Sequence, residues 1–197
     1  MRFHAADPRP HPARRAYAAR VSINGNWLRV SPADLERAKE DLDRAYDQAE
    51  AARNGEEDGR WAGTGKAWNA FDFLLERLGF EVPIVLGAES FVELPDVEPE
   101  SQEMVDFLDD LDHDWGYGPP SYLTPEQVAA AAAQLADLTE EDLIRGVDPA
   151  ELHRAQVYPD VWDRPGELAW VAHHLPGTQR FFAAAAAHGD AVICWLD

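Results

Sequence analysis

The sequence lacks most of the features that would place a protein outside the cytoplasm. Cys194 is the sole cysteine, which excludes an intramolecular disulfide and a zinc site built from cysteine pairs. No apolar run approaches the ~18–20 residues that a membrane-spanning helix needs. Arginine and proline occupy the N-terminus, where a secretory signal would carry an apolar segment. These absences favour a cytoplasmic protein without a membrane partner.

Basic residues are also scarce, and those present are unevenly placed. Only 17 lysines and arginines face 37 acidic residues, which gives a net charge of −20. Residues 1–20 carry five arginines and one aspartate, whereas no lysine or arginine occurs between Arg77 and Arg145. So negative a field repels phosphate backbones, and we therefore expect no nucleic-acid binding. The same field attracts a basic protein, but it also keeps a protein soluble without any partner.

Length and composition indicate one globular domain. The chain of 197 residues is long enough for one domain with a sizeable core and too short for two ordinary domains. Residues 1–20 show no apolar periodicity and contain three prolines, which is typical of a disordered basic arm. We therefore expect the folded domain to span residues 21–197.

Hydrophobic periodicity and capping residues predict a helix-rich domain. Helices are expected over residues 32–49, 66–78, 125–138, 166–175 and 178–187, with shorter ones within 96–114 and after Thr139 and Asp148. Ser31-Pro32 and Thr124-Pro125 are the clearest helix starts, because each joins an N-cap hydroxyl to a proline in the first turn. Pro176-Gly177 is expected to separate the last two helices.

Apolar alternation adds a small sheet and makes the fold class α+β. Strands are expected over residues 21–30, with an interruption at 24–26, and over residues 190–196, with short ones at 83–86 and 90–92. Because helices outnumber strands without alternating regularly, we expect a mixed or antiparallel sheet that includes the N- and C-terminal strands. Four tryptophans lie within these patterns and are expected in the core: Trp27, Trp68, Trp170 and Trp195.

Several blocks of the sequence resemble the YfbM-like family, a bacterial family of domains of unknown function. Residues 116–128 resemble its GYGPxxYLTPEEV stretch, and residues 157–163 resemble its YPxxWD block. Blocks at 24–32, 66–75 and 180–192 fit as well, so the resemblance covers about residues 21–197. It implies an α+β fold and assigns no catalytic residue. The family's KAWHxLHxLL block has Asn69 and Asp72 here in place of histidines, so a mechanism based on those histidines is absent.

One acidic segment partly matches a calcium-binding loop. Asp110, Asp112 and Asp114 have the D-x-D-x-D spacing that begins such a loop. Position 6 is Trp115 instead of glycine, however, and position 12 is Ser121 instead of glutamate. The loop therefore lacks its turn residue and its bidentate ligand, and we expect a solvated acidic turn and no metal site.

A second segment partly matches a phosphate-binding loop. Gly63-Thr-Gly-Lys66 resembles the end of that motif, but Arg60 and Ala67 stand where it needs glycine and serine or threonine. We expect this segment to lead into the following helix and predict no bound cofactor.

Histidine and cysteine form no local catalytic signature. None of the 7 histidines belongs to an H-E-x-x-H motif, and His173 and His174 are adjacent, so they point in different directions on a helix. Two His–Asp pairs stay open, one at 113–114 and one at 188 and 190; the alternative for both is a polar loop or helix end. Cys194 lies in an apolar strand pattern and is expected to be an inert core thiol.

Aromatic residues in turn-rich segments are the best candidates for a binding surface. Their rings stand beside glycine, proline and aspartate, where they form either corner packing or a recognition surface. Glycines and prolines at 116–120 are expected to expose the segment 109–122. The predicted binding residues are Asp110, Asp112, Asp114, Trp115, Tyr117, Tyr122, Tyr158 and Trp162.

Two functions remain open at this point. The first is a non-enzymatic acidic binding protein that engages a basic macromolecule, as an inhibitor or immunity protein does. The second is a small hydrolase or metal-using enzyme with acidic groups near 110–114 and 160–163. We favour the first, because it needs no motif that the sequence lacks.

Deletion of residues 1–20 tests the expected start of the folded domain. Because this segment has no apolar pattern, its removal should leave the midpoint of thermal unfolding unchanged, as measured by circular dichroism. A fall of several degrees would show that the segment packs on the domain.

Overall fold

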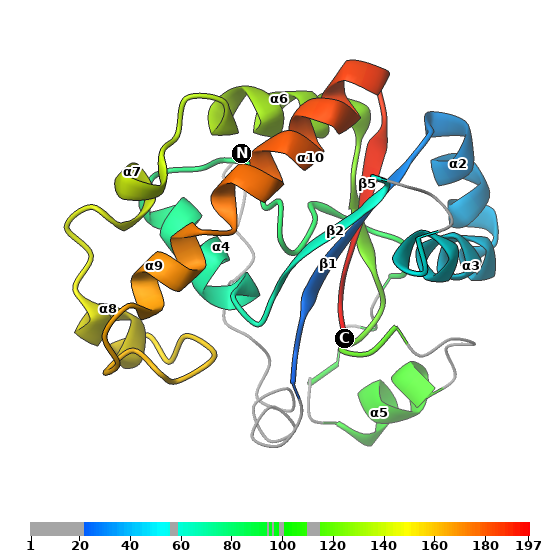
Figure 1. Cartoon of the computed structure of the whole chain (residues 1–197). Coiled ribbons are helices and arrows are strands. Elements are labelled where there is room, and N and C mark those ends of the chain that lie inside the picture. The colour runs from blue at the N-terminus through cyan, green and yellow to red at the C-terminus, as the bar shows by residue number, and fades with distance from the viewer. Residues whose placement is uncertain (1–21, 56–58, 94, 96, 99–100, 110–114) are drawn as a thin grey trace, which may run out of the picture.

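The computed structural model describes residues 22–55, 59–93, 95, 97–98, 101–109 and 115–197. The expected arm at residues 1–20 lies outside this part of the chain. Five strands form one antiparallel sheet in the order β2-β1-β5-β4-β3 (Figure 1). They are β1 (Gly25–Val30), β2 (Trp61–Gly65), β3 (Glu89–Ser90), β4 (Ser121–Leu123) and β5 (Ala191–Leu196). The predicted α+β class is confirmed, and the strands nearest the two ends of the chain lie side by side.

The pairing of β1 with β5 organises both faces of the sheet. It runs without interruption from Gly25 opposite Leu196 to Val30 opposite Ala191. Side chains alternate between the faces, as the geometry of a strand requires. Val192, Cys194 and Leu196 enter the larger core cluster together with Trp27. The alternate residues of the same strands enter a smaller cluster on the opposite face: Leu28, Val30, Ala191, Ile193 and Trp195.

Helices cover the two faces unequally. On the side of the smaller cluster lie α2 (Pro32–Glu40) and α3 (Leu42–Arg53) (Figure 1). On the other side lie α4 (Trp68–Arg77), α6 (Pro125–Leu135), α7 (Glu140–Ile144), α8 (Pro149–Arg154), α9 (Glu167–Ala172) and α10 (Leu175–His188). Helix α5 (Gln102–Asp109) precedes β4 in the chain. No helix among the described residues is long and apolar enough to cross a membrane.

The clearest sequence signals for helix starts are confirmed. The Ser31 hydroxyl accepts a hydrogen bond from the backbone N–H of Asp34 at 3.1 Å. Thr124 forms a full capping box, in which its hydroxyl accepts from the N–H of Gln127 at 3.3 Å and its own N–H donates to the Gln127 side chain at 2.8 Å. Both caps satisfy donors that a helix N-terminus otherwise leaves unpaired.

Three predicted elements differ from the structure. The helix expected over 32–49 is two helices, because the backbone of Asp41 is extended. Pro176 does not separate two helices but lies in the first turn of α10, where its missing N–H costs no hydrogen bond. The strand expected over 83–86 is a turn closed by the N–H of Gly87 and the carbonyl of Pro83 at 2.8 Å. The carbonyl of Ile84 within it accepts from the Trp27 indole at 2.6 Å.

Strand β2 was not predicted, because two of its five residues are glycines and the segment lacks the usual strand pattern. Its sequence is WAGTG, and glycine has a low strand propensity. The glycines are required by close packing: a Cβ on Gly63 would lie 2.4 Å from the carbonyl oxygen of Gly25. The register of β1 with β2 shifts at the same place, between Gly25 and Asn26. The segment expected to lead into α4 is therefore mostly the edge strand of the sheet.

One ion pair joins β1 to the residue that precedes β5, at the end of this strand pair where Val30 lies opposite Ala191. Arg29 donates from Nε at 3.1 Å and from Nη2 at 2.8 Å to one carboxylate oxygen of Asp190. The side chains are only 12% and 11% exposed. Removing one partner would leave the other charge largely buried and unpaired, which is the costly way to break such a pair.

The tryptophan predictions hold for three residues of four. Trp27, Trp68 and Trp195 are buried, at 1%, 6% and 7% exposure. Trp170 is half-buried and packs on the margin of the larger core, beside His174. Its placement in the core interior is therefore wrong, since a helix pattern alone does not tell the margin of a core from its centre.

Substitution of a buried and of a half-buried tryptophan by alanine measures the difference in their contributions to stability. Trp27→Ala should lower the free energy of unfolding by about 3–5 kcal/mol, because it removes a buried ring and the hydrogen bond from its indole to the carbonyl of Ile84. Trp170→Ala should cost only about 1–2 kcal/mol. Urea unfolding followed by circular dichroism provides both values, and equal costs would contradict the half-buried position of Trp170.

Candidate functional site

A pocket of about 180 Å³ lies between α3 and the end of β5. Pockets that bind drug-sized ligands have volumes of roughly 300–1,000 Å³, so this pocket suits a group of the size of one side chain. Its lining combines three aromatic and three charged residues: Tyr46, Trp115, Trp195, Glu50, Arg53 and Asp197.

Simple spacing places these residues on one side of the molecule. Tyr46, Glu50 and Arg53 stand at i, i+4 and i+7 of α3 and therefore share one helix face. Beside that face, α3 buries only alanines, which lets the helix approach the sheet closely. Trp195 and Asp197 are two residues apart, and the pairing with β1 continues past β5 through the N–H of Asp197 and the carbonyl of Asn24 at 3.1 Å.

A glycine brings Trp115 to the pocket. The chain passes beside the end of β5, where the N–H of Tyr117 donates to the carbonyl of Leu196 at 2.7 Å. Gly116 has a φ of +85°, and a Cβ there would lie 2.6 Å from the same carbonyl oxygen. Both the backbone conformation and the lack of space therefore require glycine.

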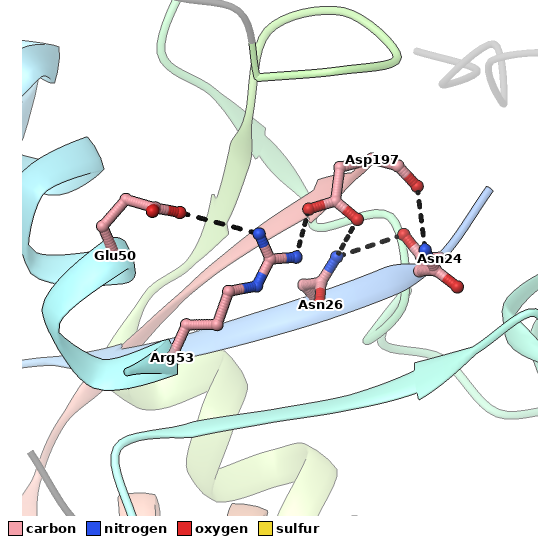
Figure 2. A network of polar contacts seen from close by, with 5 residues as sticks. All are labelled: Asn24, Asn26, Glu50, Arg53 and Asp197. Atoms are coloured by element: carbon pink, nitrogen blue, oxygen red, sulfur yellow. Dashed lines mark hydrogen bonds and ion pairs between the residues drawn. The ribbon is translucent and has the colours of Figure 1, made fainter. Parts of the chain in front are cut away.

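The polar side of the pocket is a network around Asp197, shown in Figure 2. Arg53 contacts one carboxylate oxygen of Asp197 through Nη2, and Asn26 donates to the other at 3.1 Å. Glu50 lies farther from Arg53, with 3.6 Å between Oε1 and Nη1. Both oxygens of Asp197 thus have a partner, whereas Glu50 makes only a loose contact. The three charged side chains sum to one net negative charge.

The aromatic side consists of rings that meet nearly at right angles. The Trp115 ring lies 5.4 Å from that of Tyr46 at 89° and 5.6 Å from that of Trp195 at 78°. Edge-to-face contacts of this kind are favourable, because the positive edge of one ring meets the negative face of the next. The buried Nε1–H of Trp115 has no hydrogen-bond partner within the described structure. Such a donor costs about 1–3 kcal/mol, so packing holds this ring in place against a penalty.

Of the predicted binding residues that the structure describes, only Trp115 lines this pocket. Asp110, Asp112 and Asp114 lie outside the described residues. Trp115 is 4% exposed, so the expectation that glycines and prolines would expose this ring is wrong. Tyr122 is half-buried on β4, where its ring lies 4.7 Å from that of Phe91 and 5.0 Å from the Lys39 ammonium.

The other predicted rings pack against the larger core. Trp162 is 3% exposed and donates from its indole to the carbonyl of Val157 at 2.8 Å, so it is not available on the surface. Tyr158 is half-buried with its ring 6.3 Å from that of Trp68, and Tyr117 also packs on this core. The predicted rings are therefore divided between the two core clusters and do not line one groove.

The remaining pocket residues were not found from the sequence. One signal in the sequence could have pointed to part of the pocket. Tyr46, Glu50 and Arg53 stand at helical spacing, next to a helix face on which the buried residues are all alanines. Nothing in the sequence connects that helix to Trp195 and Asp197, because the contact depends on how α3 lies on the sheet.

Those residues considered for catalysis that the structure describes do not gather at this pocket. The His188–Asp190 pair that the sequence left open does not form, since Nδ1 of His188 contacts the carbonyl of Ala184 at 2.8 Å and Asp190 is paired with Arg29. An exposed pair not predicted from the sequence joins His153 and Asp160 at 2.7 Å. His113 lies outside the described residues. Within the described part of the chain, no three metal-ligating side chains stand together.

Three residues clarify other sequence observations: the buried Cys194 and the half-buried Asn69 and Asp72. Cys194 is buried in β5, and burial raises the pKa of its thiol, as expected for an inert core residue. At the first family histidine position, Asn69 accepts a hydrogen bond from the N–H of Tyr158 at 2.8 Å and so has a structural role. At the second, Asp72 is half-buried, and burial, with a smaller effect of Glu76, raises its pKa to about 7.

The fold and the order of its elements define a single α+β domain with an antiparallel sheet between two unequal helical layers. The profile of the family described as "Domain of unknown function (DUF1877)" matches residues 21–195. The chain belongs to this family, and the predicted resemblance is confirmed.

A solved structure, the protein of unknown function YfbM from Escherichia coli, shares the fold. The TM-score is 0.54 at 15% sequence identity, over 88% of this chain and 99% of that chain. No curated protein matches the sequence significantly.

Asp72 makes stability depend on pH in a defined direction. A folded-state pKa raised from 3.8 to about 7 stabilises the fold below about pH 4, and this contribution is lost as the pH rises through 7. Asp72→Asn imitates the neutral form, so it should raise the free energy of unfolding by about 2–4 kcal/mol at pH 8 and change it little at pH 4.

Urea unfolding at the two pH values measures the effect of Asp72→Asn. Asp47→Asn, at an exposed position of α3, is the matched control and should show no such difference. A gain from Asp72→Asn that is equal at both pH values would contradict the raised pKa.

Proposed function

We propose that the protein is a non-enzymatic binding protein that engages a basic protein partner, as an inhibitor or immunity protein does. The observation that carries this proposal is the uncompensated charge of residues 81–142. This segment contains seventeen acidic residues and no lysine or arginine. A surface of one sign attracts a partner of the opposite sign and accelerates their encounter.

The acidic residues of α2 and α3 provide the contrast. There, carboxylates have a cation three residues away on the same helix or at its cap: Asp34 with Arg37, Glu36 with Lys39 at 2.7 Å, Asp41 with Arg44 at 3.0 Å and Glu50 with Arg53 at 3.6 Å. These i, i+3 pairs compensate the charge of that region locally.

Apart from Glu141 and Asp142, the described acidic residues of 81–142 have no such compensation. The ion pairs of this segment within the described structure are those of Glu141 and Asp142 with Arg145, at its end. Most of these carboxylates are exposed: Glu81, Glu89, Glu93, Glu98, Glu103, Asp106, Glu126, Asp137, Glu140 and Glu141. Solubility needs a net charge but no segregation of it, so the uneven placement favours a partner.

Affinity capture at two salt concentrations tests this function. The immobilised protein should retain a basic protein from an extract of its source cell at about 0.05 M salt and lose it at about 0.5 M, because salt screens exposed charges. The association rate of the captured partner is then measured with two variants that each remove three exposed negative charges.

The first variant carries Glu93→Gln, Glu98→Gln and Glu103→Gln in the uncompensated segment, and it should slow association several-fold. The control carries Glu40→Gln, Asp47→Asn and Asp163→Asn and should have a smaller effect, although the net charge is the same. Capture of no basic protein, or equal rates for the two variants, would contradict the proposal.

A further inference from the structure

We propose that the pocket between α3 and β5 binds a lysine side chain of the basic partner. This inference rests on the proposed function for the source of the lysine, and on the pocket itself for its chemistry. Three features carry it: the arrangement of the rings, the position of the Glu50 carboxylate, whose contact with Arg53 is long, and the size of the pocket.

The rings favour an ammonium group. An organic cation is attracted to the faces of aromatic rings within about 6 Å, and ammonium ligands are bound by cages of several rings. Tyr46, Trp115 and Trp195 line the pocket with ring planes at 89° and 78° to one another, which suits a rounded group better than a flat one. A planar guanidinium stacks best between parallel faces, which this pocket does not offer.

The charges place the ammonium near Glu50. Asp197 is engaged by Arg53 and Asn26 through its two carboxylate oxygens. Glu50 is 47% exposed at the side chain, and its 3.6 Å contact with Arg53 is longer than the 2.7–2.9 Å or so of a charge-assisted hydrogen bond. Glu50 can therefore accept a second cation without losing a strong partner.

The size and polarity of the pocket match one lysine. A volume of about 180 Å³ has room for a single side chain. Lysine has an apolar stem that can pack along the rings while its charged end stays near water. The ring faces provide the apolar surface for the stem, and the ammonium lies where these faces meet the exposed Glu50, so that it contacts both.

A small-molecule probe tests the pocket directly. Nα-acetyl-lysine methylamide is titrated into the full-length protein, and the indole N–H signals of Trp115 and Trp195 are followed by NMR, after assignment with Trp115→Phe and Trp195→Phe. Both signals should shift and saturate. The norleucine analogue, which keeps the stem without the charge, should give no saturating shift, and the arginine analogue should bind more weakly than lysine.

Variants separate the contributions of charge and ring. Glu50→Gln should weaken lysine binding about two- to fivefold, the value of an exposed ion pair, whereas Glu40→Gln on α2 should leave it unchanged. Tyr46→Leu should weaken binding, and Tyr46→Phe should weaken it less, because both remove the hydroxyl and only the first removes the ring. These positions are not fully buried, and circular dichroism confirms that each variant is folded.

The inference is overturned if lysine causes no saturating shift, if norleucine or arginine binds as tightly, or if Glu50→Gln has no effect. Because the probe is a small molecule, this result does not depend on finding a partner. Salt-sensitive capture of a basic protein without lysine binding would refute the pocket and keep the proposed function. Lysine binding without any captured basic protein would support the pocket and refute the proposed function.

Discussion

The antiparallel pairing of β1 with β5 is the constraint on which the rest of the structure depends. It joins segments near the two ends of the chain, and Arg29 and Asp190, which lie 161 residues apart, pair across it. The entropic cost of closing so long a loop grows only slowly with the length of the loop. Burial of apolar side chains on both faces of the two strands offsets this cost. Contacts of such separation also slow folding, because the chain loses the entropy of closing the loop before these contacts compensate for it.

The pocket follows from that pairing. The extension of β5 past Leu196 places Asp197 beside Asn24 and Asn26. The backbone of Gly116 packs against the same end of β5, and this contact positions Trp115. Helix α3 then closes the pocket with Tyr46, Glu50 and Arg53. Residues from four distant stretches of the chain thus meet only because the two central strands are in register.

The sequence predicted best what is decided locally. Ser31 and Thr124 begin helices through contacts with residues three positions on, so their caps were visible without the fold. Strand β2 could not be predicted, because glycine disfavours a strand in the local sequence. Gly63 is required there by the backbone of β1, which is adjacent in space but distant in the sequence. The site shows the same division: Trp115 was singled out from the sequence as a candidate binding residue, but its burial and its neighbours depend on the position of α3 against β5.

The isolation of Cys194 has a practical consequence. Its thiol lies in the central strand β5, in contact with the carbonyl of Ile84 at 3.6 Å, and solvent does not reach it in the folded state. An alkylating reagent can therefore modify it only after β5 separates from its neighbours. The rate of that modification therefore measures how often the sheet opens around β5. A cysteine introduced on the surface for labelling will react long before Cys194 does.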